Sequence, residues 1–224
     1  IVRLESSGGM VHAYGLAAAQ LARIKEAGLH LTVCIDKVAA SGGYMMACVA
    51  DKILAAPFAV VGSIGVVAQV PNFHDLLEKH DIDVEVFTAG KYKRTVTVFG
   101  ENTEEDKQKF QQELEETHKL FKDFVRKYRP SLDVEQVATG EHWYGEDAIT
   151  RNLVDALQTS DSYILEKMTD SELYAIQSRQ KPTIAQKLGI SQAAQAVVAT
   201  AIDKLPDALA KLESAKMPMV KKSP

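Results

Sequence analysis

The chain has 224 residues, of which 46% are hydrophobic and 25% are charged, and its formal net charge is −4. This is a globular composition, with enough residues for one sizeable core and an appendage. The slightly acidic balance excludes the basic surface that nucleic-acid binding requires, and no run of about 18 apolar residues is present to span a membrane.

The sequence begins at Ile1, without methionine and inside an expected strand. We therefore expect a fragment whose preceding signal or anchor segment is not visible. Cys34 and Cys48 each lie in an apolar element, which favours buried free thiols over a disulfide.

The N-terminal part predicts a β-turn-α-β unit. A strand over 1–4 runs into a turn at Gly8 and Gly9, a helix over 12–27 follows, and a second strand covers 31–36. Such a unit joins parallel strands by a right-handed crossover. The glycine turn and the turn after the second strand then meet at the carboxyl edge of the sheet, where open α/β sheets bind ligands.

The stretch over 38–47 predicts a strand that turns sharply into an apolar helix, with Ser41 at the corner. Unpaired N–H groups at a helix N-terminus stabilise an oxyanion that forms beside such a serine. Gly42 and Gly43 remove two Cβ atoms where a substrate backbone would approach. The alternative is that Ser41 is only an N-cap and the glycines only shape a turn.

Further along the chain, apolar and alternating runs predict strands over 51–57, 60–67 and 82–87 and a short helix over 72–80. Ser63 interrupts the second of these strands and needs a hydrogen-bond partner if it is buried. A bond to its own backbone is the alternative.

The next loop contains a cluster of basic residues, Lys91, Lys93 and Arg94. A lysine activates a serine only when its amine is neutral, so a pKa of about 10.4 must be depressed by burial or by nearby cations. The cluster offers the cations, and Val96 and Val98 offer apolar cover. The alternative is an ordinary exposed basic turn.

The longest predicted helix is capped at Asn102 or Thr103 and ends before Pro130, with one apolar face. That face fits either a cover for the sheet or an oligomer contact. A short helix over 146–151 and a strand or turn over 153–157 follow.

The character of the chain changes after residue 160, and we predict a catalytic domain over 1–160 and a helical extension over 161–224. The extension is either an oligomerisation or membrane-proximal appendage or a loosely ordered tail. Its expected elements are three helices and a disordered end, over 163–177, 191–205, 206–216 and 217–224.

Five short motifs follow one another in order from Ile1 to about Leu157. They are Ser6-Ser7-Gly8-Gly9, Ser41-Gly42-Gly43-Tyr44, Gly62-Ser63-Ile64-Gly65-Val66, Lys93, and Tyr144-Gly145-x-x-Ala148 with Leu153-Val154-Asp155. Each is weak alone, but in this order they resemble the signal peptide peptidase family of SppA and SohB, most closely the bacterial SohB type. The resemblance implies an α/β fold of repeated ββα units, shared with ClpP and the crotonases.

The resemblance also implies a catalytic dyad. Ser41 matches the nucleophile, Lys93 matches the general base, and Ser63 matches a serine that hydrogen-bonds the lysine. Lys91, two residues away, is the obvious alternative base. In a ClpP-like triad the base would instead be a histidine, for which His74 is the candidate.

The resemblance also implies which backbone N–H groups form the oxyanion hole. Gly42 matches one N–H donor, and the second donor is either Gly8 or Gly9, between which the sequence does not decide. Relatives commonly carry proline where Ser7 stands, so we expect the first turn of this chain to be less rigid than theirs.

The function implied is a serine endopeptidase that cuts hydrophobic peptides, such as cleaved signal peptides, without a metal or cofactor. The family also implies ring-like homo-oligomers whose neighbouring subunits complete the substrate groove. An N-terminal anchor absent from this chain would hold the catalytic domain on the periplasmic side of the bacterial inner membrane. The alternatives are a non-catalytic crotonase-like scaffold and an acyl-CoA enzyme that uses the same oxyanion architecture without a covalent serine.

Overall fold

The computed structural model describes residues 1–176, and a compact unit within it extends from Ile1 to Leu173. The helices predicted over 191–205 and 206–216 and the disordered end predicted over 217–224 lie outside the described residues.

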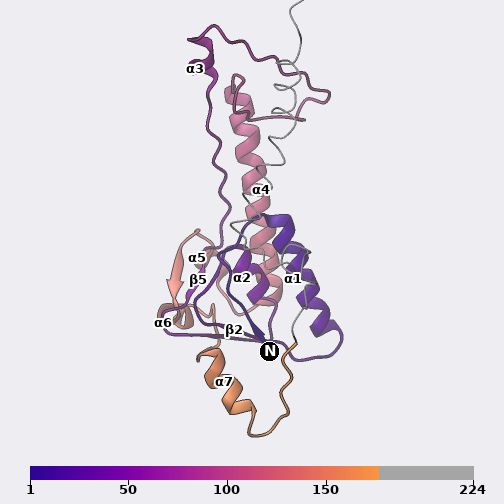
Figure 1. Ribbon diagram of the computed structural model, residues 1–224, viewed down its shortest axis with the longest axis vertical. Coiled ribbons are helices and arrows are strands. Elements are labelled where there is room, and N and C mark those ends of the chain that lie inside the picture. The colour runs from indigo at the N-terminus through magenta and orange to yellow at the C-terminus, as the bar shows by residue number, and fades with distance from the viewer. Residues whose placement is uncertain (177–224) are drawn as a thin grey trace, which may run out of the picture. The chain divides into compact units, whose positions relative to one another are not determined.

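The described part of the chain contains seven strands, which form two sheets (Figure 1). They are β1 (Val2–Arg3), β2 (Thr32–Ile35), β3 (Val38–Ala40), β4 (Lys52–Ala55), β5 (Val60–Gly62), β6 (His142–Tyr144) and β7 (Ala156–Leu157). The first sheet has the order β1-β2-β4-β7 and is parallel throughout. The second has the order β3-β5-β6, in which β3 and β5 are parallel and β6 is antiparallel.

The helices of the same part are α1 (Val11–Glu26), α2 (Gly42–Ala47), α3 (His74–Glu78), α4 (Glu104–Tyr128), α5 (Val134–Val137), α6 (Gly145–Thr150) and α7 (Ser160–Lys167). α1 packs against α2, and the buried side chains of α1 are the small Ala18 and Ala22, which allow the two helices to approach closely. The predicted α/β class with a parallel sheet is confirmed, and β2, β3 and α2 form one ββα unit.

The core lies on both faces of the first sheet. Every residue of β2 is buried, as expected for an inner parallel strand with both faces covered. The larger apolar cluster includes side chains of α1, α2 and α4, and a smaller one joins Cys34 and Leu54 to Tyr163 of α7.

Both cysteines are buried and free, as predicted. Burial raises the pKa of the Cys34 thiol to about 11 and that of Cys48 to about 12. Both thiols are therefore protonated and unreactive at neutral pH.

Helix α7 begins three residues before the predicted start and ends at Lys167 rather than near 177, so its predicted length was wrong. Its start is fixed by Asp36, whose carboxylate accepts hydrogen bonds from the Ser160 N–H at 2.8 Å and from the Ser160 hydroxyl at 2.5 Å. Burial opposes ionisation of Asp36, but these bonds and the charge of Arg3 outweigh it and lower the pKa of the carboxyl. The division into a catalytic domain and an extension stays a prediction.

One predicted strand is shorter in the structure than expected, and another is absent from the described residues. The strand predicted over 60–67 ends at Gly62, because Gly62 and Ser63 both have positive φ (104° and 51°) and turn the chain out of the ladder. The alternating segment over 82–87 forms no strand, because no neighbouring segment of the described chain pairs with it, and an unpaired strand is unstable in water.

Helix α4 is buried in the core only near its C-terminal end. Thr103 and Asp106 form a capping box at its start, as the sequence predicts, and Phe121 and Val125 near its end are buried in the core. Beyond the helix, the Arg129 guanidinium pairs with the Asp155 carboxylate at 2.7 Å and ties this end to the sheet.

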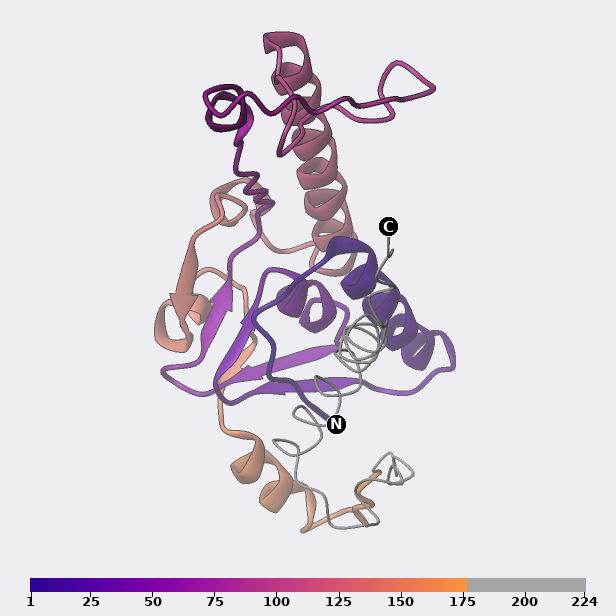
Figure 2. The same cartoon turned by 45° about the horizontal axis from the view of Figure 1, so that its top comes forward.

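The N-terminal half of α4 lies beside α3 and the segment that connects the two helices (Figures 1 and 2). Lys91 pairs with Glu105 at 2.9 Å, and the Phe73 N–H donates to the Val98 carbonyl at 2.8 Å. We call residues 66–120 the arm and the rest of the compact unit the body.

Candidate active site

Ser41 lies at the turn between β3 and α2, with φ 54° and ψ −122°. Its N–H donates to the Gly62 carbonyl at 2.8 Å, and its carbonyl accepts from the Met45 N–H at 3.0 Å. Its hydroxyl makes no capping bond to the helix, so the N-cap alternative is not what the structure shows. A strained strand-to-helix turn of this kind presents a serine hydroxyl outward, which is the geometry that a nucleophilic serine requires.

The first glycine turn lies directly against this serine, as the parallel topology predicts. Gly8 has φ +94°, and a Cβ built on it would lie 2.8 Å from both the Gly42 nitrogen and Ser41 Cβ. Ser6, which precedes the glycine turn, is bonded to the strand that leads to Ser41, because its carbonyl accepts from the Ala40 N–H at 3.0 Å. Any side chain at Gly8 would therefore fill the space beside the serine.

The backbone donors around this space differ in their partners. The Gly8 N–H donates to Ser6 Oγ at 3.2 Å. The N–H groups of Gly9 and Gly42 have no hydrogen-bond partner among residues 1–176. Both N–H groups are thus unpaired within the described chain, as a backbone donor to an oxyanion must be before the reaction.

Tyr14 and Ser6 join the two turns, and sequence reasoning missed this role. The Tyr14 and Ser6 hydroxyls lie 2.9 Å apart, and the Tyr14 ring contacts the faces of Gly9 and Gly42 from which a Cβ would project. The spacing of Ser6 and Tyr14 carries no signal in the sequence, and the contact with Gly42 depends on how α1 packs against α2.

Ser63 is the structural neighbour of Ser41. Ala40 and Gly62 are paired in the β3–β5 ladder, so the two serines follow directly at the ends of adjacent parallel strands. The Ser63 N–H donates to the Glu141 carbonyl at 2.6 Å, and the Ser63 hydroxyl has no partner among the described residues. Its predicted bond to a lysine stays a prediction.

In the described chain, Lys93 does not lie beside Ser41 or Ser63. It is exposed in the arm, and its N–H donates to the Gly90 carbonyl at 3.1 Å. Its neighbour Lys91 is held at the start of α4 by Glu105, and about 24 Å of helix separates Glu105 from the buried Phe121.

The alternative base at Lys91 is engaged elsewhere. The hydrogen bond and charge of Glu105, with a smaller effect of Tyr92, raise the pKa of the Lys91 amine. This is opposite to the change that a general base needs.

The arm also contains a group of metal-type ligands, His74, Asp75 and Glu78, whose ligand atoms lie within 4.8 Å of one another. His74 bonds its neighbour Asp75 at 3.3 Å, and no hydrogen bond joins it to Ser41 in the described chain. All three are on the surface of a helix of five residues, where acidic groups are common without any ion.

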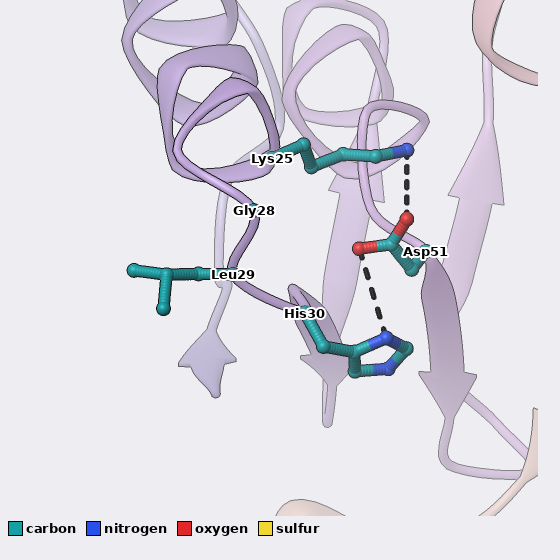
Figure 3. A pocket seen from close by; sticks show the side chains of 5 residues that line it. All are labelled: Lys25, Gly28, Leu29, His30 and Asp51. Carbon is teal, nitrogen blue, oxygen red and sulfur yellow. Dashed lines mark ion pairs between the residues drawn. The ribbon is translucent and has the colours of Figure 1, made fainter.

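A shallow pocket of about 290 Å³ lies elsewhere (Figure 3). It is lined by Lys25, Gly28, Leu29, His30 and Asp51, and Lys25 pairs with Asp51 at 3.0 Å. These residues precede β2 and β4, so the pocket is at the amino ends of the strands. Ser41 follows the carboxyl end of β3, and parallel sheets bind ligands at that end.

Residues 23–174 match the family described as Peptidase family S49, and residues 1–21 match Peptidase family S49 N-terminal. The chain belongs to peptidase family S49. It is 65% identical over 189 residues to a Haemophilus influenzae protein named "Probable protease SohB", a match that covers 84% of this chain and 54% of that protein. A protein of the same name from Buchnera aphidicola (subsp. Acyrthosiphon pisum) is 58% identical over 177 residues, covering 79% and 53%.

The resemblance to the SppA and SohB family is thereby confirmed, and the chain spans about half the length of these curated relatives. Among solved structures, a mutant of a membrane-bound stomatin-specific protease matches with TM-score 0.43 and 11% identity, over 74% of this chain and 66% of that one. An enoyl-CoA hydratase/isomerase family member matches with TM-score 0.38 and 13% identity, over 99% and 70%. None of the helices within residues 1–176 has the length and apolar composition of a membrane span.

Proposed function

We propose that this chain is the catalytic part of a serine peptidase in which Ser41 is the nucleophile and Lys93 is the general base. The observation that carries the proposal is the strained turn of Ser41, whose hydroxyl makes no capping bond and which directly precedes Gly42, a residue whose N–H is unpaired in the described chain. Membership of a peptidase family supports it.

The reaction would begin when neutral Lys93 takes the proton of the Ser41 hydroxyl and the serine oxygen attacks the peptide carbonyl. The N–H groups of Gly42 and Gly9 hold the resulting oxyanion. The protonated Lys93 then gives its proton to the leaving amine as the C–N bond breaks. A water, deprotonated by Lys93, attacks the acyl-enzyme and releases the acid and free Ser41.

The second oxyanion donor is assigned to Gly9 rather than Gly8. The Gly8 N–H already donates to Ser6 Oγ, whereas that of Gly9 has no partner in the described chain. Gly8 has the separate task of leaving the oxyanion space empty, because its missing Cβ would lie 2.8 Å from the Gly42 nitrogen.

We infer that the Lys93 that serves a given Ser41 belongs to a neighbouring copy in a homo-oligomer. The arm carries Lys93 away from the body, and it exposes large apolar side chains that a partner would cover. These are Val67, Val70, Phe73, Leu76, Ile82, Val84, Val86, Phe87, Tyr92, Phe99 and Leu120. Burial of the arm between copies would also desolvate the amine, which is what activation of a lysine requires.

The substrates proposed are hydrophobic peptides such as cleaved signal peptides, cut at the periplasmic side of the bacterial inner membrane. The family resemblance supports this assignment, together with an anchor outside this chain. Membrane fractionation and protease accessibility of the full-length protein would test it, and recovery of the intact protein in the cytosolic fraction would contradict it.

The dyad is tested with a fluorogenic apolar peptide and an unfolded protein as substrates for the full-length wild type, Ser41→Ala, Lys93→Ala and Lys91→Ala. We expect a loss of kcat of roughly 10⁴-fold or more in Ser41→Ala and Lys93→Ala, and near wild-type rates in Lys91→Ala. A serine-directed phosphonate should add one mass adduct per wild-type chain and none to Ser41→Ala. Absence of cleavage and labelling in assembled wild type would favour the scaffold or acyl-CoA alternatives.

A further inference from the structure

We propose that Tyr14 is a positioning residue of the oxyanion hole, which holds the glycine turn and the start of α2 at a fixed separation. The inference rests on the proposed peptidase function, because the two backbone donors that Tyr14 spaces are those assigned to the oxyanion.

The side chain of Tyr14 contacts both turns at once. A Cβ on Gly9 would lie 2.8 Å from Tyr14 Cε2, and a Cβ on Gly42 would overlap Tyr14 Cγ and lie 2.8 Å from Cδ1. One aromatic ring is therefore packed between the two residues that supply the free N–H groups. A planar ring has a fixed width, so it sets the distance between the turns.

The hydroxyl of Tyr14 fixes the glycine turn in a second way. It lies 2.9 Å from Ser6 Oγ, with either oxygen as donor, and Ser6 Oγ accepts the Gly8 N–H at 3.2 Å. This chain of bonds holds the Gly8 N–H on Ser6 and so restrains the turn that carries the Gly9 N–H. The backbone of Ser6 is itself bonded to Val38 and Ala40 of β3.

Tyr14 is itself held by the body. It is half-buried in the first turn of α1, where its N–H donates to the Met10 carbonyl at 3.1 Å, and it packs against the main apolar cluster. A side chain that only filled the core would need neither the hydroxyl bond nor contact with both glycines.

The experiment compares full-length wild type with Tyr14→Phe, Ser6→Ala, the double variant and Tyr163→Phe. Tyr163 is the matched control, because its hydroxyl pairs with the Thr32 hydroxyl at 3.2 Å in another part of the body. For each protein we would measure kcat, KM, the thermal midpoint and the affinity of a peptide aldehyde, which forms an oxyanion on the serine.

We expect kcat to fall about fivefold in Tyr14→Phe and in Ser6→Ala, with KM within about twofold and a parallel loss of aldehyde affinity. The double variant should be no worse than Ser6→Ala alone, since Ser6→Ala already removes the hydroxyl bond that Tyr14→Phe breaks. Tyr163→Phe should lower the thermal midpoint and leave kcat unchanged. Tyr14→Leu, which removes the ring, should lower kcat by on the order of 100-fold.

The proposal is overturned if Tyr14→Phe and Tyr163→Phe change stability alike and leave kcat and aldehyde affinity at the wild-type values. Additive losses in the double variant would also contradict it. If wild type cleaves and Ser41→Ala does not, such results reject only the role of Tyr14. If wild type itself neither cleaves nor binds the aldehyde, the proposed function fails first. If Tyr14→Leu does not fold, the kcat and aldehyde affinity of Tyr14→Phe and Ser6→Ala still test the role of Tyr14.

Discussion

The body and the arm differ in how completely one chain builds them. In the body, Ser41 is fixed by backbone bonds to Gly62 and Met45, and Gly8 lies in contact with it. In the arm, residues 66–100 are mostly exposed and are joined to α4 by a few contacts, among them the exposed Lys91–Glu105 pair. Under the proposed function, the nucleophile half of the site would be preorganised within one chain, whereas the base half would need a further surface.

The sharpest test of the preorganised half is Gly8→Ala. The new Cβ would strain a residue at φ +94° and enter the oxyanion space, so we expect kcat to fall by roughly 10³-fold. Gly28→Ala is the matched control, because Gly28 has φ +77° and nothing within 4 Å of its ideal Cβ. It should cost about 1 kcal/mol of stability and leave kcat unchanged. Equal activity of the two variants would contradict the account of the site.

The arm is tested by removing exposed apolar side chains. Phe87 is 88% exposed in the arm, and we expect Phe87→Ser to weaken self-association by about 10- to 100-fold, because one aromatic side chain would no longer be buried between copies. Phe58→Ser is the control, since Phe58 is 82% exposed in the body. Sedimentation velocity over a concentration series measures the self-association of both variants. Equal oligomer size in the two would argue against an arm interface.

The smallest expected effect concerns the body alone and depends on pH. Asp36 has a pKa below its ordinary value when folded, so its ionised form stabilises the fold above about pH 4 and this contribution is lost as the pH falls through the folded-state pKa. Ser160→Ala removes one of its hydrogen bonds and should lower the free energy of unfolding by about 1 to 2 kcal/mol at pH 7.

The difference between Ser160→Ala and wild type should shrink in urea titrations as the pH falls through the lowered folded-state pKa of Asp36, because the carboxyl then becomes protonated and loses its charged hydrogen bonds. Ser162→Ala, an exposed position on the same helix, should match wild type at every pH. A Ser160→Ala difference that stays constant with pH would show that Asp36 is not the partner that matters.

The sequence predicts the body well because its signals are local. The helix now seen at Val11–Glu26, the buried strand at Thr32–Ile35 and the turn at Ser41 follow from periodicity and from glycines at fixed places. Parallel topology then places Gly8 beside Ser41, which the structure confirms.

The errors concern features that the residue pattern does not carry. β5 ends at Gly62 because Gly62 and Ser63 both have positive φ, which the apolar run over 60–67 does not indicate. The alternating segment over 82–87 has no partner strand in the described chain, a fact that no local pattern carries. Tyr14 was missed because its contact with Gly42 forms only when α1 and α2 pack together.

The central claim, that Lys93 of one copy serves Ser41 of another, is tested most directly by co-expressing full-length Ser41→Ala and Lys93→Ala chains with different tags. Assemblies purified through both tags should regain about a quarter of the wild-type activity, since that share of sites pairs an intact serine with a neighbour's intact lysine. Mixed assemblies no more active than either parent would place both residues of each site in one chain.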